Sequence, residues 1–186
     1  KLSVRPRHTY LIDLEQRQEV MLSGMSPERR KNIKKAQEEG LEVEVCEDPV
    51  RFMKMIDMTI ERQQIGLNKE ILAKILSSEC IKKNRSMYIC TIAGKDIAAG
   101  LLVWDRDRTY YLMGAYDSDN SHEGGGALII WQAILEAKKR GNSTFDFEGS
   151  MIPEVERFFR GFGGKMHTFF SIEKKTWLGH LAKHLK

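Results

Sequence analysis

The sequence predicts an α/β (α+β) fold in which a mixed, mostly antiparallel sheet is flanked by helices. Three apolar segments follow one another between residues 86 and 117, and the tight turns Gly94-Lys95 and Arg106-Asp107 separate them, as in an antiparallel meander. A segment with helical periodicity then precedes the strand-like sequence T-F-D-F-E at residues 144–148. A strand that follows a crossover helix runs parallel to the strand before it, so the sheet is expected to be mixed.

Length and composition restrict the class of protein. The chain has 186 residues, 41% hydrophobic and 30% charged, so it can bury a core without disulfides and is not disordered in composition. The longest apolar run, Ile97–Trp104, is far shorter than the roughly 18–20 residues that cross a bilayer. Cys46, Cys80 and Cys90 form no C-x-x-C pair and lie among apolar neighbours, which favours reduced core thiols and a cytoplasmic location.

Capping signals and periodicity place the elements of the first half of the chain. Ser26-Pro27-Glu28 supplies a cap, a proline at the first helical position and an acidic first turn, so a helix is expected from Ser26 to Gly40. The other elements expected here are a strand at Thr9–Leu14, an alternating strand at Leu41–Cys46, a helix from Asp48 to Gly66 and a helix announced by Asn68.

The second half contains the meander and the crossover. Basic residues at 138–140 followed by Gly141 indicate the end of the crossover helix. The elements expected here are strands at Ser86–Ala93, Asp96–Asp105 and Arg108–Asp117, a glycine-rich loop at Ser118–Gly126, the crossover helix, a strand at 144–148, a helix opening at Pro153, a strand at Lys165–Glu173 and a C-terminal helix from Thr176.

Four segments carry a resemblance to a known family. They are R-R-K-N-I-K-K-A-Q-E-E-G (Arg29–Gly40), G-G-G-A-L-I-I-W-Q-A-I-L-E-A-K-K-R-G (Gly124–Gly141), F-D-F-E-G-S (Phe145–Ser150) and E-R-F-F-R-G-F-G-G (Glu156–Gly164). With the order of elements, they resemble the GNAT N-acyltransferases, and in particular the Fem-like branch that includes peptidoglycan-bridge aminoacyl transferases. The resemblance extends over essentially the whole chain.

The resemblance implies a fold, an activity and partners. In such proteins the fourth and fifth strands splay apart and the acyl donor, acetyl-CoA or aminoacyl-tRNA, lies between them. The expected activity is transfer of an acyl or aminoacyl group to an amine, with a cell-wall precursor as one candidate acceptor. Fem-like proteins usually carry two GNAT-like subdomains. Residues 1–40 are accordingly expected to form the junction with an upstream subdomain, and residues 41–186 the acyltransferase domain.

The glycine-rich loop is the candidate donor site. Its exposed N–H groups and the positive end of the following helix suit a phosphate or pyrophosphate. The resemblance implies donor contacts at His122, Gly124, Gly125, Gly126 and Ala127. The Arg or Gln with which acetyl-CoA-using GNATs open this loop is absent, because His122 or Ser121 occupies that position in the two registers. A connector that needs glycine only for its turn is the alternative interpretation.

Three carboxylates are candidates for the base that deprotonates an amine. Asp146 and Glu148 are two apart, so in a strand both point to one face, and neighbouring carboxylates raise one pKa. The alternative is that Asp146 ties down a loop and that Glu148 pairs with an arginine. Asp117 is the third candidate, or a turn cap.

Alternation along the strand that ends at Asp117 also assigns its tyrosines to faces. It places Tyr111 on the same face as Asp117. It places Tyr110 and Tyr116 on the opposite face.

Basic residues indicate an anionic partner. Five of them lie between Arg29 and Lys35, and like charges at i,i+4 repel, which favours a phosphate-bearing substrate such as a nucleotide-linked precursor or tRNA. The candidate contacts are Arg30, Asn32 and Lys34, together with Arg157 and Arg160 on the short helix. The alternative function is a non-catalytic module that binds an anionic partner through this basic helix, and the chain alone could also be inert if its acceptor site needs a second subdomain. No metal is expected, because His180 and His184 lack a third ligand.

Overall fold

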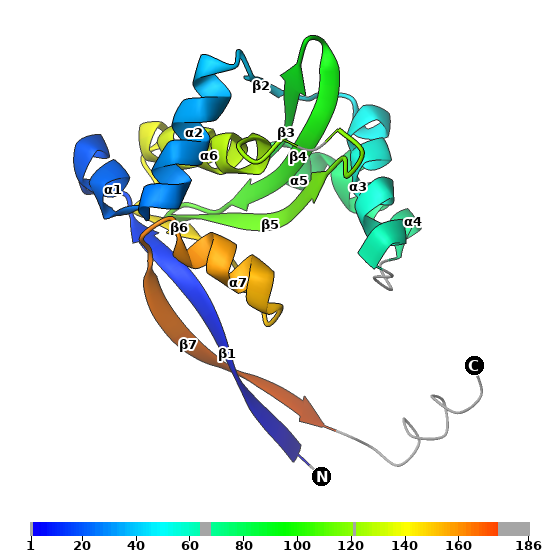
Figure 1. Ribbon diagram of the computed structural model, residues 1–186. Coiled ribbons are helices and arrows are strands. Elements are labelled where there is room, and N and C mark those ends of the chain that lie inside the picture. The colour runs from blue at the N-terminus through cyan, green and yellow to red at the C-terminus, as the bar shows by residue number, and fades with distance from the viewer. Residues whose placement is uncertain (1, 64–67, 121, 175–186) are drawn as a thin grey trace.

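The computed structural model describes residues 2–63, 68–120 and 122–174. The expected C-terminal helix from Thr176 lies outside these residues. The described chain forms one seven-stranded sheet in the order β2-β3-β4-β5-β6-β1-β7 (Figure 1). Every strand pair is antiparallel except β5–β6, which is parallel, so the predicted mixed, mostly antiparallel α/β sheet is confirmed.

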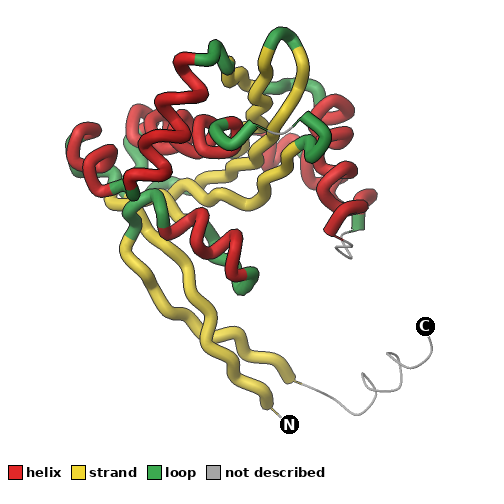
Figure 2. Tube along the Cα trace, viewed as in Figure 1, coloured by secondary structure: helices red, strands yellow, loops and turns green. Residues whose placement is uncertain are grey.

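The elements follow the predicted order (Figure 2). The structure adds two short helices, and its first strand is longer than predicted. Their bounds are β1 Leu2–Asp13, α1 Gln18–Gly24, α2 Pro27–Glu38, β2 Glu42–Val45, α3 Pro49–Gln63, α4 Lys69–Ser77, α5 Glu79–Lys82, β3 Arg85–Ile92, β4 Lys95–Trp104, β5 Arg108–Tyr116, α6 Gly125–Arg140, β6 Thr144–Asp146, α7 Pro153–Arg160 and β7 Lys165–Lys174. Both predicted side-chain caps form, since Ser26 and Asn68 accept from the backbone N–H groups of Arg29 and Ile71. None of the described helices is long and apolar enough to cross a membrane.

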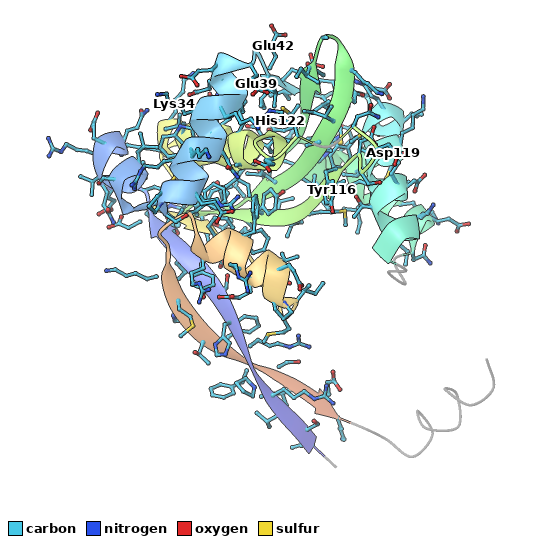
Figure 3. All side chains as sticks on the ribbon, viewed as in Figure 1. Lys34, Glu39, Glu42, Tyr116, Asp119 and His122 are labelled. Atoms are coloured by element: carbon cyan, nitrogen blue, oxygen red, sulfur yellow. The ribbon has the colours of Figure 1, made fainter. Side chains whose placement is uncertain are left out.

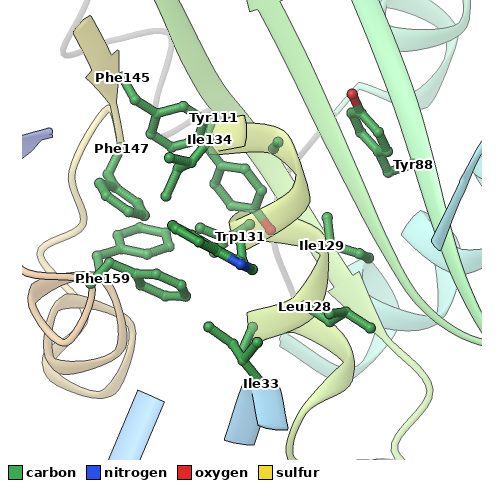
Figure 4. Packing of buried hydrophobic residues seen from close by; sticks show 14 of the residues in the cluster. Ile33, Tyr88, Tyr111, Leu128, Ile129, Trp131, Ile134, Phe145, Phe147 and Phe159 are labelled. Carbon is green, nitrogen blue, oxygen red and sulfur yellow. The ribbon is translucent and has the colours of Figure 1, made fainter. Parts of the chain in front are cut away.

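Two cores lie on opposite faces of the sheet. On one face α6 packs against β3, β4 and β5, and α2 packs on α6. On the other face α3 packs against β4 and β5. The first core contains an aromatic group, shown from close by in Figure 4, in which Phe147 lies 5.0 Å from Phe159 and 5.5 Å from Phe162 between ring centroids. Phe159 and Phe162 are buried in this core, and the half-buried Phe158 packs against it.

The strand β1 differs most from its prediction. It begins at Leu2 instead of Thr9, because β7 pairs with it from Leu2↔Lys174 to Leu11↔Lys165. The far part of this pair leaves the body of the molecule as a two-stranded ribbon (Figure 1). Most side chains on this part are exposed, so the sequence carries no buried alternation there that would predict a strand. β1 lies inside the single sheet and α2 packs on α6, so both belong to the same folded unit as the rest of the described chain. The division at residue 40 stays a prediction.

Candidate acyl-transfer site

A gap in strand pairing defines the candidate site. Along β5, pairing with β6 is limited to Arg108↔Thr144, Thr109↔Phe145 and Tyr110↔Asp146. β5 continues to Tyr116, and no strand among the described residues pairs with this part of its β6-facing edge. Beyond Asp146 the chain turns away and enters α7, which lies between β5 and the β1–β7 ribbon in Figure 1. The two parallel strands are therefore joined at one end and diverge at the other.

A β-bulge lies on β5 at this divergence. Leu101 and Leu102 of β4 pair with Met113 and Tyr111, which leaves Leu112 as an extra residue. Bulges re-aim backbone and side chains and occur often beside active sites. Leu112 is 46% exposed, so the bulge is open to solvent. It lies just past the last β5–β6 pair, where a backbone N–H can face a ligand between the strands.

The bulge also overturns one prediction about the tyrosines. Tyr111 pairs with Leu102 and Tyr116 pairs with Ala98, and both partners belong to the core on the α6 face. Simple alternation had placed Tyr111 and Tyr116 on opposite faces. The extra residue Leu112 shifts the alternation by one, which brings both tyrosines to the same face.

Glycines at the start of α6 allow three elements to meet. A Cβ on Gly124 would lie 2.5 Å from the carbonyl oxygen of Asn32, and a Cβ on Gly125 would lie 3.3 Å from Ile97. Gly126 faces Phe158 of α7 at an ordinary contact distance of 3.7 Å. Gly124 is thus required by close packing with α2 and not by a turn conformation, since its φ of -93° is open to any residue, whereas Gly126 has room for a side chain.

His122 fastens the loop to α2. Its Nδ1 accepts a hydrogen bond from the Gly124 N–H at 3.0 Å, so Nε2 carries the proton and donates to Glu39 Oε2 at 2.8 Å (Figure 3). The N–H of Gly125 is also occupied, by the His122 carbonyl oxygen at 3.1 Å. The first turn of α6 therefore offers the N–H groups of Gly126 and Ala127 to an anion, supported by the dipole of a 16-residue helix.

We expect Gly124→Ala to lower the free energy of unfolding by about 1–3 kcal/mol, because the added methyl group forces α2 away from α6. Chemical denaturation monitored by circular dichroism measures this change. The matched control is Gly126→Ala, whose methyl group has room; its free energy of unfolding should be unchanged or slightly higher. Equal losses in both variants would contradict the role assigned to the α2–α6 contact.

Asp146 is a structural hub. Its Oδ1 accepts from Thr9 Oγ1 at 2.6 Å and from the Glu148 N–H at 2.9 Å, and its Oδ2 accepts from Arg108 Nη1 at 3.0 Å. The side chain is 7% exposed. It thus ties β1, β5 and the turn after β6 together, which is the loop-fastening alternative for this residue.

Glu148 lies outside the strand, because β6 ends at Asp146. Its φ of 56° is left-handed, and Gly149 follows with a φ of 76°. The expectation that Asp146 and Glu148 share a strand face is therefore wrong, since the chain leaves the β conformation between them. Burial, and secondarily the charge of Asp146, raises the pKa of the Glu148 carboxyl. A carboxylate with a raised pKa is a better proton acceptor near neutral pH.

Asp117 caps the loop that follows β5. Its carboxylate accepts hydrogen bonds from the N–H groups of Asp119 and Asn120, at 2.9 and 3.3 Å, and from Asn120 Nδ2 at 2.7 Å. The hydrogen bond from Asn120 is the main cause that lowers the pKa of Asp117. A lowered pKa makes it a weaker base than Glu148.

The basic residues of α2 divide between structural contacts and an exposed face. Arg30 donates to the carbonyl oxygens of Ser23 and Met25, and Asn32 is buried where α2 meets α6. Lys34 is exposed and pairs with Glu38 at 3.5 Å (Figure 3). Much of the charge therefore has a partner within the protein.

On α7, Arg157 and Arg160 are exposed. Arg160 lies 3.7 Å from Glu156, which also accepts from the Tyr10 hydroxyl. Glu148 forms no ion pair with either arginine, both of which lie in the described part of the chain.

Comparison with known proteins identifies the family. A model of the acetyltransferase (GNAT) domain matches residues 27–160, which is most of the chain. The chain belongs to the GNAT acetyltransferase family. The match begins at α2 and ends with α7, so it includes the splayed strands, the bulge and the start of α6. No curated protein matches the sequence.

Solved structures of GNAT-like proteins share the fold at low identity. FemX is 12% identical with a TM-score of 0.74, and the match covers 96% of this chain and 63% of FemX. The C-terminal domain of a putative lysylphosphatidylglycerol synthetase from Agrobacterium fabrum is 14% identical with a TM-score of 0.68, covering 98% of this chain and 65% of that one. This GNAT chain thus spans less than two thirds of either protein.

An acetyltransferase that is matched over most of its length also shares the fold. An aminoglycoside acetyltransferase from an uncultured soil metagenomic sample, solved with sisomicin, is 14% identical with a TM-score of 0.53. The match covers 69% of this chain and 89% of that enzyme. The fold of this GNAT chain is therefore shared with FemX, with a lysylphosphatidylglycerol synthetase domain and with an aminoglycoside acetyltransferase.

Proposed function

We propose that this GNAT protein is an N-acyltransferase that moves an acyl group from the thioester of acyl-CoA, or from the ester of aminoacyl-tRNA, to an amine. The observation that carries the proposal is the divergence of β5 and β6 beside the Leu112 bulge and the start of α6. The N–H groups of Gly126 and Ala127 fit one donor phosphate, and the edge of β5 past Tyr110 can lie along the donor.

The residues of the site divide the chemical work between them. The amine attacks the acyl carbonyl carbon, a C–N bond forms, and the C–S or C–O bond to the donor breaks. A backbone N–H at the bulge holds the carbonyl oxygen as negative charge develops on it. Glu148 accepts the proton that the amine loses, and the leaving group takes a proton from solvent. Holding both substrates across the divergence contributes through proximity, on the order of 7–11 kcal/mol at best.

The structure favours acyl transfer over a module that only binds anions. A binding module needs several free cations on α2, but Arg30 is bonded to backbone carbonyls and Arg29, Lys34 and Lys35 have acidic partners, which leaves Lys31 as the exposed cation of this group without one among the described residues. The absence of an Arg or Gln at His122 leaves the choice between the two donors open. A cell-wall precursor as acceptor and a cytoplasmic location remain part of the proposal.

A turnover assay tests this function. Purified protein is incubated with acetyl-CoA, or with aminoacyl-tRNA, and a panel of primary amines, and free thiol or deacylated tRNA is measured against buffer. Acylated amine detected by mass spectrometry with either donor supports the proposal. Absence of product with both donors, together with no protection by either donor in hydrogen exchange at residues 111–116 and 124–127, would refute it.

A further inference from the structure

A cavity of about 200 Å³ lies where the turn after β6 meets the β1–β7 ribbon. Its walls include Arg7 of β1, Phe169 of β7 and the turn that begins at Glu148. Since one water molecule takes about 30 Å³ in the liquid, the cavity has room for the polar end of a small organic molecule. Arg7 belongs to no motif or periodic pattern in the sequence.

Two opposite charges line the cavity without meeting. Among the described residues, the Glu148 carboxylate accepts no hydrogen bond and forms no ion pair. The Arg7 guanidinium likewise donates no hydrogen bond and forms no ion pair with any of them. The two charged groups are therefore farther apart than the 4 Å that defines an ion pair. Here the space between them is left for a ligand that presents a positive or proton-donating group to one and an anion to the other.

Local backbone geometry fixes Glu148 in this position. The left-handed conformation of a non-glycine residue is costly and persists where the surroundings impose it, often at functional sites. Gly149 packs so closely on β1 that a Cβ there would lie 1.9 Å from the His8 carbonyl oxygen. The neighbouring acid, Asp146, is neutralised by Arg108 at 3.0 Å, so Glu148 is the carboxylate that stays free for a ligand.

The face of the sheet connects this cavity to the acyl-transfer site. Thr9 and Arg7 are two apart on β1, so both point to the face on which Thr9 bonds Asp146. Phe145 and Phe147, next to Asp146, are buried in the α6-side core. The cavity therefore opens on the opposite face, and an acceptor there would approach the divergence of β5 and β6 from the side away from the start of α6.

We propose that this cavity binds the acceptor, and that the acceptor is an amine that also carries a carboxylate. Arg7 holds the carboxylate through a charge-assisted, bidentate contact, and Glu148 faces the amine. The inference rests on the proposed function and adds the chemical class of the acceptor to it. Free amino acids and the termini of small peptides both belong to this class.

Binding of matched ligand pairs tests the inference without requiring turnover. L-Alanine, L-lysine and glycylglycine are each compared with their C-terminal amides by isothermal titration calorimetry on the full chain. At least one acid is expected to bind about tenfold or more tightly than its amide, since a charge-assisted hydrogen bond contributes on that order. Arg7→Gln and Arg7→Ala should bring the ratio close to one, and Arg7→Lys should retain part of it.

The control is Arg5→Ala, because Arg5 lies on the same face of β1, two residues further along, and does not line the cavity. It should keep the acid-to-amide ratio of the parent. Equal affinity of the parent for every acid and its amide, no binding of either, or an unchanged ratio in Arg7→Gln would overturn the inference. If the parent binds an acid more tightly than its amide but transfers no acyl group to any of the acids, the proposed function is wrong and the binding site still stands.

Discussion

Glu148→Gln is expected to lower kcat by roughly 100- to 1000-fold, which is the range that general base catalysis contributes. Glutamine keeps the size of the side chain but cannot take the proton from the attacking amine. Glu148 is the strongest candidate because its carboxylate accepts no hydrogen bond from the described residues. The carboxylates of Asp117 and Asp146 each accept three hydrogen bonds. Steady-state release of CoA thiol or deacylated tRNA measures the loss.

The pH profile separates loss of the base from general damage to the site. Burial and Asp146 raise the pKa of Glu148, so the carboxylate is protonated and inactive below that pKa. The rate should rise with pH through this raised pKa in the parent, and the rise should vanish in Glu148→Gln. The matched control is Glu154→Gln, an exposed residue in the first turn of α7 that should retain the rate and the profile. A Glu148→Gln enzyme with the parental profile would exclude Glu148 as the base.

Much of the fold could be predicted because its signals are local. The cap of α2 depends on Ser26 and a proline beside it, and the meander depends on two tight turns. The parallel pairing of β5 and β6 follows from the crossover helix between them. Each of these features is set by a few neighbouring residues, so a single sequence contains them.

The features that the sequence did not reveal depend on distant partners. The ribbon part of β1 exists because β7 pairs with it across more than 150 residues. The bulge at Leu112 depends on how β5 aligns with β4, and alternation alone predicts the wrong faces for its tyrosines. The shape of the splay depends on β6 ending at Asp146, just before the left-handed residues Glu148 and Gly149, and the close packing of Gly149 on β1 involves a distant segment.

The candidate site could be predicted only in part, because its geometry also depends on distant partners. Glu148 was identified, but its separation from Asp146 depends on a left-handed turn that Gly149 and the β1 backbone impose. Arg7 carried no signal, because it lies in a segment whose exposed side chains do not resemble a strand. The glycine after Glu148 indicates a turn, but it does not show which residue of that turn has a positive φ.

Phe147→Ala is expected to lower the free energy of unfolding by about 3–5 kcal/mol, the usual cost of truncating a buried phenylalanine. Phe147 is 1% exposed, and its ring centroid lies within 5.5 Å of those of Phe145, Phe159 and Phe162. The truncation leaves a cavity between β6 and α7. For a chain of this size the loss corresponds to a fall in Tm of roughly 6–20 °C, measured by calorimetry.

The control for this truncation is Phe170→Ala, which removes the same atoms from a ring that is 63% exposed on the ribbon. It should change the free energy of unfolding by about 0.5 kcal/mol or less. Phe147→Leu should lose less than Phe147→Ala, because it fills part of the cavity. If Phe147→Ala were no more destabilising than Phe170→Ala, the aromatic group would not hold α7 against the sheet. The turn that carries Glu148 would then be held by the Asp146 hydrogen bond and by the packing of Gly149 on β1 alone.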